Sequence, residues 1–184
     1  MCMAIPKFSQ KLPRVVLGDK LVVYKVFIEI EDEVTKAVYL KTPHRSFQYT
    51  IGKLQTSRIT KKPNNEVNIW YTRDYDGEVV MEGLHAFVNL EDAIDEAKSR
   101  QSKADNDYYT SSRIYKHRVS MFGHTRGHTH PKREVIKVYA CHVPRFARYY
   151  RGYWENQWPT LIDNIVASKL IVVGRADIPE KSNG

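Results

Sequence analysis

Short runs of β-branched and aromatic residues recur along the chain, and turn-forming residues separate them. The two longest runs are Lys20–Ile30, KLVVYKVFIEI, and Glu134–Val143, EVIKVYACHV, which Pro144 ends. Shorter runs of similar composition cover residues 36–41, 45–53, 67–72, 78–82 and 170–173. Strands and helices do not alternate regularly between these runs. The pattern therefore predicts an α+β domain around a mainly antiparallel, twisted sheet.

One hairpin and one helix stand out from this pattern. The segment Asp74–Gly77, DYDG, favours a tight hairpin because Asp-Gly suits the positive φ angles of such turns. A helix is predicted at about 90–102, where Asn89 suits the N-cap and acidic residues occupy the first turn. Its apolar face consists of Leu90, Ala93, Ile94 and Ala97. Shorter helical segments are expected near 145–154 and 160–168, and a candidate strand at 113–122.

The length of 184 residues suits one domain with a single core. We expect a loose N-terminal arm over residues 1–13, one α+β domain over 14–178 and a disordered tail over 179–184. No apolar run approaches the roughly 18 residues of a membrane span, and the start lacks the apolar stretch of a secretory signal. Cytoplasmic residence is the resulting expectation. Cys2 and Cys141 are expected as free thiols rather than as a disulfide or a zinc motif.

Positive charge is concentrated between Arg113 and Arg151. The ten Lys and Arg residues of this segment face one acid, Glu134, so the local sum is +9, whereas the whole chain carries +8. Five of the seven histidines lie in the same segment. A basic cluster of this density predicts a phosphate-bearing partner.

Within this segment, the residues RFARYYRGYW alternate cations with aromatic rings. Guanidinium groups can bind phosphate oxygens while rings stack on bases, so the composition suits a nucleotide or a nucleic acid. The predicted ligand and phosphate contacts are Arg126, Lys132, Arg133, Arg145, Arg148, Tyr149, Arg151, Tyr153 and Trp154. The open alternative is an amphipathic turn with its rings in the core and its arginines in water.

The histidines suggest two further sites. His124, His128 and His130 have a spacing that could hold Zn²⁺ or Mn²⁺, but the cationic residues beside them would repel a metal ion. A solvated polar loop is therefore favoured over a metal site. His85 lies just before the predicted helix, where it could contact a ligand phosphate or form a hydrogen bond within the core.

Three pieces of the chain are YTIGK at Tyr49–Lys53, GLHAFVNLEDA at Gly83–Ala93 and ASKLIVV at Ala167–Val173. Together they resemble a family of small phage and prophage proteins, over roughly residues 20–178. The resemblance implies an accessory role in phage biology, in the host cytoplasm, and no defined chemistry.

A fainter resemblance is to the ADP-ribosyltransferase fold, whose comparable pieces would be Gly83–Ala93 and Glu134 at the opening of a later strand. This resemblance implies NAD as the cofactor, and it implies Glu134, Arg45 and His85 as catalytic candidates. The Ser-Thr-Ser strand and the paired-glutamate motif of that family are absent from this chain.

Three hypotheses of function follow from these observations. The leading one is a phage-type accessory protein, including one that acts against host defence, which binds a nucleotide or nucleic acid without catalysis, cofactor or membrane. The first alternative is an NAD-dependent enzyme of the ADP-ribosyltransferase type. The second is an inhibitor whose basic face binds an acidic host protein. Motifs of the common enzyme classes, such as a glycine-rich phosphate loop or a nucleophile elbow, are absent from the sequence.

Overall fold

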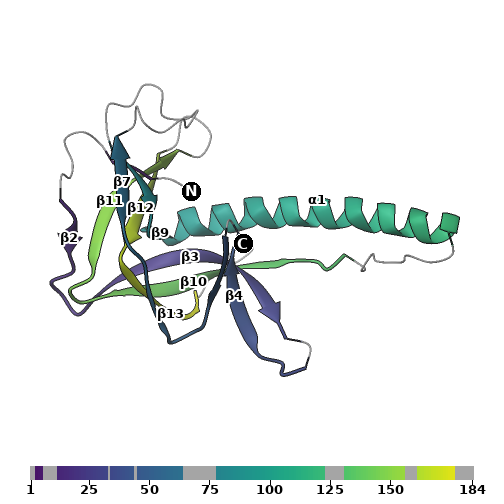
Figure 1. Ribbon diagram of the computed structural model, residues 1–184, viewed down its shortest axis with the longest axis horizontal. Coiled ribbons are helices and arrows are strands. Elements are labelled where there is room, and N and C mark those ends of the chain that lie inside the picture. The colour runs from purple at the N-terminus through teal and green to yellow at the C-terminus, as the bar shows by residue number, and fades with distance from the viewer. Residues whose placement is uncertain are drawn as a thin grey trace, which may run out of the picture.

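The computed structural model describes residues 3–5, 12–32, 34–43, 45–63, 78–122, 131–155 and 161–176. These residues form one helix and an antiparallel sheet, which confirms the predicted α+β class. The strands are β1 (Met3–Ile5), β2 (Arg14–Val15), β3 (Lys20–Glu31), β4 (Val38–Thr42), β5 (Arg45–Tyr49), β6 (Leu54–Thr56), β7 (Thr60–Pro63), β8 (Glu78–Glu82), β9 (Leu84–Phe87), β10 (Val135–Pro144), β11 (Arg148–Glu155), β12 (Leu161–Ala167) and β13 (Lys169–Arg175), and the helix is α1 (Leu90–Phe122). The helix lies along one side of the sheet and its second half extends beyond the sheet (Figure 1).

The long strand β3 is the centre of the sheet. It pairs with β10 from Lys20, opposite Pro144, to Glu29, opposite Val135. It also pairs with β4 near its end, and with β9 at a single position, Tyr24 opposite Phe87. Ten strands follow one another in the order β6-β13-β10-β3-β9-β12-β11-β1-β8-β7, while β2 pairs with β11 and the β4–β5 hairpin extends from β3.

Two segments that were expected to be helical are strands instead. Residues 145–154 form a turn followed by most of β11, and β12 occupies the segment near 160–168. β12 is rich in β-branched residues, and it pairs with β9 on one side and with β11 on the other. Backbone pairing on both sides outweighs the helix-like spacing of the local sequence, because local propensity is weaker than tertiary context.

Part of the expected N-terminal arm also belongs to the sheet. Ala4 in β1 lies opposite Tyr153 of β11 on one side and opposite Val79 of β8 on the other. β1 therefore connects two regions of the sheet. The predicted strand at 67–72, the hairpin turn Asp74–Gly77 and the tail at 179–184 lie outside the described residues.

The helix begins where it was predicted and continues far beyond residue 102. The side-chain amide of Asn89 donates to Asp92 Oδ2 at 3.1 Å, next to the first turn. The predicted apolar face is confirmed, because Ala93 and Ala97 are buried in a cluster with residues of β3 and β10. The candidate strand at 113–122 is wrong, since these residues are helical. No glycine or proline occurs between residues 90 and 122, and Gly123 follows directly.

Apolar side chains cover both faces of β3. Val26 and Ile28 lie on the face that α1 covers, whereas Val23 and Phe27 belong to the larger core cluster on the opposite face. This division follows the two-residue period of a strand. Lys25 lies on the same face of β3 as Val23 and Phe27, and it is buried.

Within the described part of the chain, no helix has both the length and the apolar composition that crossing a bilayer requires.

Candidate ligand pocket around Lys25

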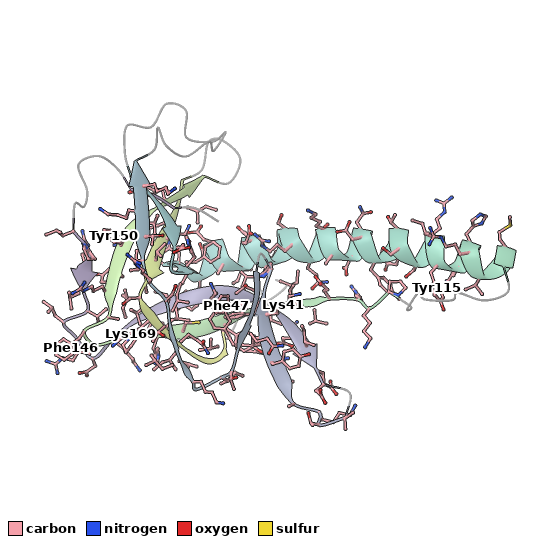
Figure 2. The ribbon with its side chains drawn as sticks, viewed as in Figure 1. Lys41, Phe47, Tyr115, Phe146, Tyr150 and Lys169 are labelled. Carbon is pink, nitrogen blue, oxygen red and sulfur yellow. The ribbon has the colours of Figure 1, made fainter. Side chains whose placement is uncertain are left out.

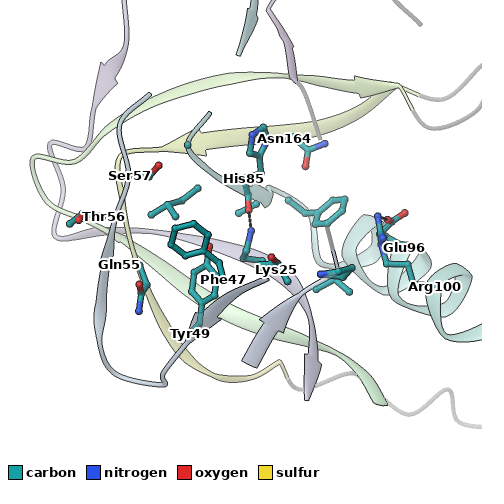
Figure 3. A pocket seen from close by; sticks show the side chains of 17 residues that line it. Lys25, Phe47, Tyr49, Gln55, Thr56, Ser57, His85, Glu96, Arg100 and Asn164 are labelled. Atoms are coloured by element: carbon teal, nitrogen blue, oxygen red, sulfur yellow. Dashed lines mark hydrogen bonds and ion pairs between the residues drawn. The ribbon is translucent and has the colours of Figure 1, made fainter. Parts of the chain in front are cut away.

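A pocket with a volume of about 110 Å³ lies beside the point where β3 and β9 diverge. Its walls come from β3, the β4–β5 hairpin, β6, β9, β12 and the first turns of α1. Lys25 lies near its centre, with Phe47 and Tyr49 beside it and with Glu96 and Arg100 on the side of the helix (Figure 3). Segments that are far apart in the sequence therefore meet at one cavity.

Lys25 is the central charge of the pocket. Its Nζ donates a hydrogen bond of 2.5 Å to the backbone oxygen of His85, and it lies 5.8 Å and 5.7 Å from the ring centroids of Phe27 and Tyr49. Burial lowers the pKa of Lys25 to about 8, and the neighbouring Cys141 opposes this effect. Burial also raises the pKa of the Cys141 thiol to about 12, so that thiol is neutral at physiological pH. The Lys25 ammonium therefore has polar and aromatic neighbours but, among the described residues, no carboxylate ion-pair partner.

The buried acid of the pocket already has a partner. Glu96 is 5% exposed, and it forms an ion pair with Arg100, which lies one turn further along α1. This pairing compensates the charge of the carboxylate within the helix. The described lining consequently retains one net positive charge, from Lys25.

Aromatic side chains and side chains with hydroxyl groups line the open side of the pocket. Phe47 of β5 is 60% exposed, whereas Tyr49, two residues later on the same face of the strand, is 4% exposed. Thr56 and Ser57 also line the pocket, and Asn164 lies next to His85 (Figure 3). Such a lining can hold a planar ring against an aromatic side chain and offer hydrogen bonds to polar substituents.

The basic aromatic segment lies elsewhere, and its rings are divided between core and surface. Tyr150 is 6% exposed and Tyr149 packs against the larger core cluster, whereas Tyr153 is 39% exposed. Arg148 and Arg151 are three residues apart in a strand, so they lie on opposite faces of the sheet. They cannot form one continuous platform of the kind that a helix would present.

Two of the predicted phosphate contacts bind carboxylates of the protein itself. Arg151 Nε donates to the two oxygens of Asp163 at 2.9 Å and 3.0 Å. Arg133 donates to Asp105 at 2.7 Å and 2.8 Å. Any anionic ligand would have to compete with these partners.

The other predicted contacts are exposed or lie outside the described part of the chain. The guanidinium of Arg145 lies over the ring of Phe146, 4.8 Å from its centroid. Figure 2 shows Phe146 at the end of the molecule away from the projecting helix. Arg148 and Lys132 are exposed. The residue Arg126 and the side chain of Trp154 are among those that the structure does not describe.

The three residues implied by the ADP-ribosyltransferase resemblance have different positions. His85 lines the pocket. Glu134 is exposed and precedes β10, five positions before Tyr139, which lies opposite Lys25. At the rise of an extended strand this separation is about 16 Å. The side chain of Arg45 lies outside the described part of the structure.

No metal-binding group is found among the residues that the structure describes. Nowhere in that part of the chain do three or more His, Cys, Asp or Glu side chains gather as metal ligands would. His124, His128 and His130 lie outside it.

Sequence reasoning missed Lys25, Phe47 and Asn164 as site residues. A lysine within a strand is ordinarily an exposed residue of the alternating pattern. The available signal was the two-residue spacing, because Lys25 lies two positions from the core residues Val23 and Phe27 and so shares their face of the strand.

Comparisons with protein-family models, curated proteins and solved structures find no match to this chain.

Proposed function

We propose that the pocket around Lys25 binds a small anionic molecule that carries a planar ring, the chemical class to which nucleotides belong. The observation that carries the proposal is the buried Lys25 ammonium, which faces the pocket and has a neutral carbonyl as its hydrogen-bond acceptor. A buried cation without a counter-charge is costly, and an anionic ligand group would remove much of that cost. The free protein would therefore be prepared for an anion.

The ring of the ligand would lie against Phe47 at the open side of the pocket. An aromatic side chain that is 60% exposed beside a polar pocket gains contact area when a planar group stacks on it. The pocket volume of about 110 Å³ accommodates one such group or one phosphoryl group in its depth, with the remainder of the ligand at the mouth. The sequence predicts nucleotide binding at the basic aromatic segment, whereas this proposal locates it in the pocket around Lys25.

The test measures ligand binding by calorimetry and by thermal unfolding. The probes are AMP, ATP and NAD, with adenosine as the uncharged control. Wild-type protein should bind at least one anionic probe and should bind adenosine more weakly. Lys25→Met should lose at least about tenfold in affinity, because it removes the charge but keeps the length of the side chain. Phe47→Ala should lose several-fold.

Lys20→Met is the matched control, since Lys20 is an exposed lysine five residues earlier in the same strand. It should bind the probe as the wild type does. Equal affinity of Lys25→Met and the wild type, or equal binding of adenosine and AMP, would overturn the proposal. The absence of a thermal shift with all three anionic probes would overturn it as well.

A further inference from the structure

The second half of α1 projects from the body of the protein (Figure 1). Up to Asp105 the helix is held by buried alanines, by the Gln101 side chain and by the pair with Arg133. Between residues 106 and 121, Tyr108, Ser112 and Tyr115 are partly buried and the other side chains are exposed. These three residues share one helical face, and Figure 2 shows Tyr115 on the side of the helix on which β10 lies. The other flanks of the helix are open.

One of the open flanks carries a continuous stripe of polar and basic side chains. Its members follow one another at alternating spacings of four and three residues: Ser102, Asn106, Tyr109, Arg113, Lys116 and Ser120. Every member is exposed. This spacing keeps them on one side of a helix over a length of about 27 Å. We call this surface the α1 stripe.

The α1 stripe contains no acid. Arg113 and Lys116 form no ion pair within the described part of the chain. Asp105 is adjacent in sequence but is held by Arg133, and Asp107 lies on another flank of the helix. The field around Arg113 and Lys116 is therefore positive, since no carboxylate of the stripe compensates these two charges.

The sequence of this half does not favour an isolated helix. Thr110, Ser111 and Ser112 are weak helix formers, and a helix with only one partly buried face gains little stability from packing. Stabilisation by a bound partner would offset this weakness. The charge of the α1 stripe requires that partner to be anionic.

We propose that the α1 stripe binds the phosphate backbone of a nucleic acid. Arg113 and Lys116 would neutralise phosphates, while the hydroxyl and amide groups of the stripe would donate hydrogen bonds to phosphate and sugar oxygens. A projecting helix also fits the major groove of B-form DNA, which is about 12 Å wide. A protein partner or a second copy fits less well, because the stripe has no aliphatic side chain to bury. This surface is separate from the Lys25 pocket, and the inference does not depend on the proposed function.

The test measures fluorescence anisotropy of labelled nucleic acids at ~100 mM salt. The probes are a DNA duplex of about two helical turns, an RNA duplex of the same length and a single DNA strand. The stripe variant is Arg113→Ala with Lys116→Ala. The matched control is Lys20→Ala with Lys169→Ala, which removes the same charge from exposed residues outside the α1 stripe. Circular dichroism and the melting temperature establish that both variants are folded.

Wild-type protein should bind at least one probe, and the stripe variant should lose at least about tenfold while the control loses less than threefold. The dependence of log affinity on log salt should also become shallower by about two in the stripe variant. An equal loss in both variants would overturn the proposal, because it would show an effect of net charge alone. The proposal would also be overturned if the wild-type protein bound none of the three probes. If polyglutamate bound as tightly as the nucleic-acid probes and the stripe variant lost this binding, the surface would be assigned to an acidic protein instead. If the wild type self-associated in sedimentation and the stripe variant did not, the surface would be assigned to a second copy of the chain.

Discussion

Lys25 of β3 donates a hydrogen bond of 2.5 Å to the backbone oxygen of His85 in β9, next to the single position at which these strands pair. The contact crosses the gap that becomes the pocket. A carbonyl oxygen offsets part of the desolvation of an ammonium group but supplies no counter-charge. The protonation of Lys25 is therefore linked both to folding and to the binding of an anion.

The free energy of unfolding should rise between pH 8 and pH 9. Burial lowers the pKa of Lys25 from 10.5 to about 8, so above pH 8 the unfolded state binds a proton that the native state has released, and stability increases with pH. From pH 9 the opposite contribution begins, because burial raises the pKa of the Cys141 thiol from 9.0 to about 12. Urea denaturation across this range should therefore show a rise followed by a plateau.

Two variants separate these contributions. Lys25→Met should abolish the rise, and Cys141→Ala should extend it toward pH 10.5, with a total gain of roughly 3 kcal/mol. A wild-type stability that is flat from pH 8 to pH 9 would contradict the buried, protonated amine.

Tyr139→Phe should lower the free energy of unfolding by about 1.5–3 kcal/mol, because it removes a hydrogen bond to a charged group. The Tyr139 hydroxyl donates to Glu29 at 2.6 Å, and Arg175 donates to both oxygens of the same carboxylate at 2.7 Å and 2.5 Å. Phenylalanine preserves the edge-to-face ring contact with Phe27. Chemical denaturation at neutral pH measures the loss, and a variant as stable as the wild type would refute it.

The Glu29 carboxylate should also make the free energy of unfolding decrease at acidic pH. Burial tends to raise the pKa of Glu29, but the hydrogen bonds from Arg175 and Tyr139 outweigh it and hold the pKa below 4.5. A carboxyl group whose pKa is lower in the folded than in the unfolded state contributes stability that is lost as the pH falls through the folded pKa. The loss should be smaller in Tyr139→Phe than in the wild type, since one cause of the lowered pKa is gone.

Gln101→Glu should destabilise the protein by about 2 kcal/mol. Gln101 Oε1 accepts from the Ile136 amide at 2.9 Å, and Nε2 donates to the Glu134 oxygen at 3.0 Å and to Asp105 at 2.9 Å. Glutamate keeps the acceptor but loses both donated bonds and places a second carboxylate beside Asp105. Denaturation and faster hydrogen exchange of the Ile136 amide would report the loss. Ser99→Ala, an exposed change on the same helix, should stay within about 0.5 kcal/mol.

Gly83→Ala should cost about 2–4 kcal/mol. Gly83 has a φ of +137°, and a Cβ there would lie 2.2 Å from Val166 Cγ1. Addition of Val166→Ala should restore part of the loss, because it removes the clash but not the backbone strain. Gly174→Ala is the control, since no heavy atom lies within 4 Å of its added Cβ. Equal melting temperatures of Gly83→Ala and Gly174→Ala would contradict the expectation.

The strongest elements could be predicted from the sequence because their signals are local. The runs Lys20–Ile30 and Glu134–Val143 correspond to β3 and β10 to within a residue or so, and Asn89 correctly marks the start of α1. The predicted helix ends too early because residues 101–107 are polar and because the β-branched and aromatic residues after 112 have strand-like composition. The chain has no helix-breaking residue before Gly123, and the helix continues to Phe122. The strand character of β11 and β12 depends on pairing partners from distant segments.

The candidate site could be predicted only in part, because it depends on tertiary contacts. His85 was identified as a possible ligand contact, and it lines the pocket. The partners that make it a site come from β3, β5 and β12, and no local pattern shows that these strands meet. The concentration of charge between Arg113 and Arg151 is a sequence property, but the structure divides it among helix, turn and strand.

The order in which the chain is synthesised conflicts with the order in which the sheet is assembled. β3 leaves the ribosome early, but its main partner β10 lies more than a hundred positions later, as the pair Lys25 and Tyr139 illustrates. A nascent chain that ends within α1 consequently presents β3 with one long unpaired edge, and such edges recruit other strands. Productive folding during synthesis should thus wait for β10, and expression should be more sensitive to holdase chaperones than to the overall stability of the finished protein.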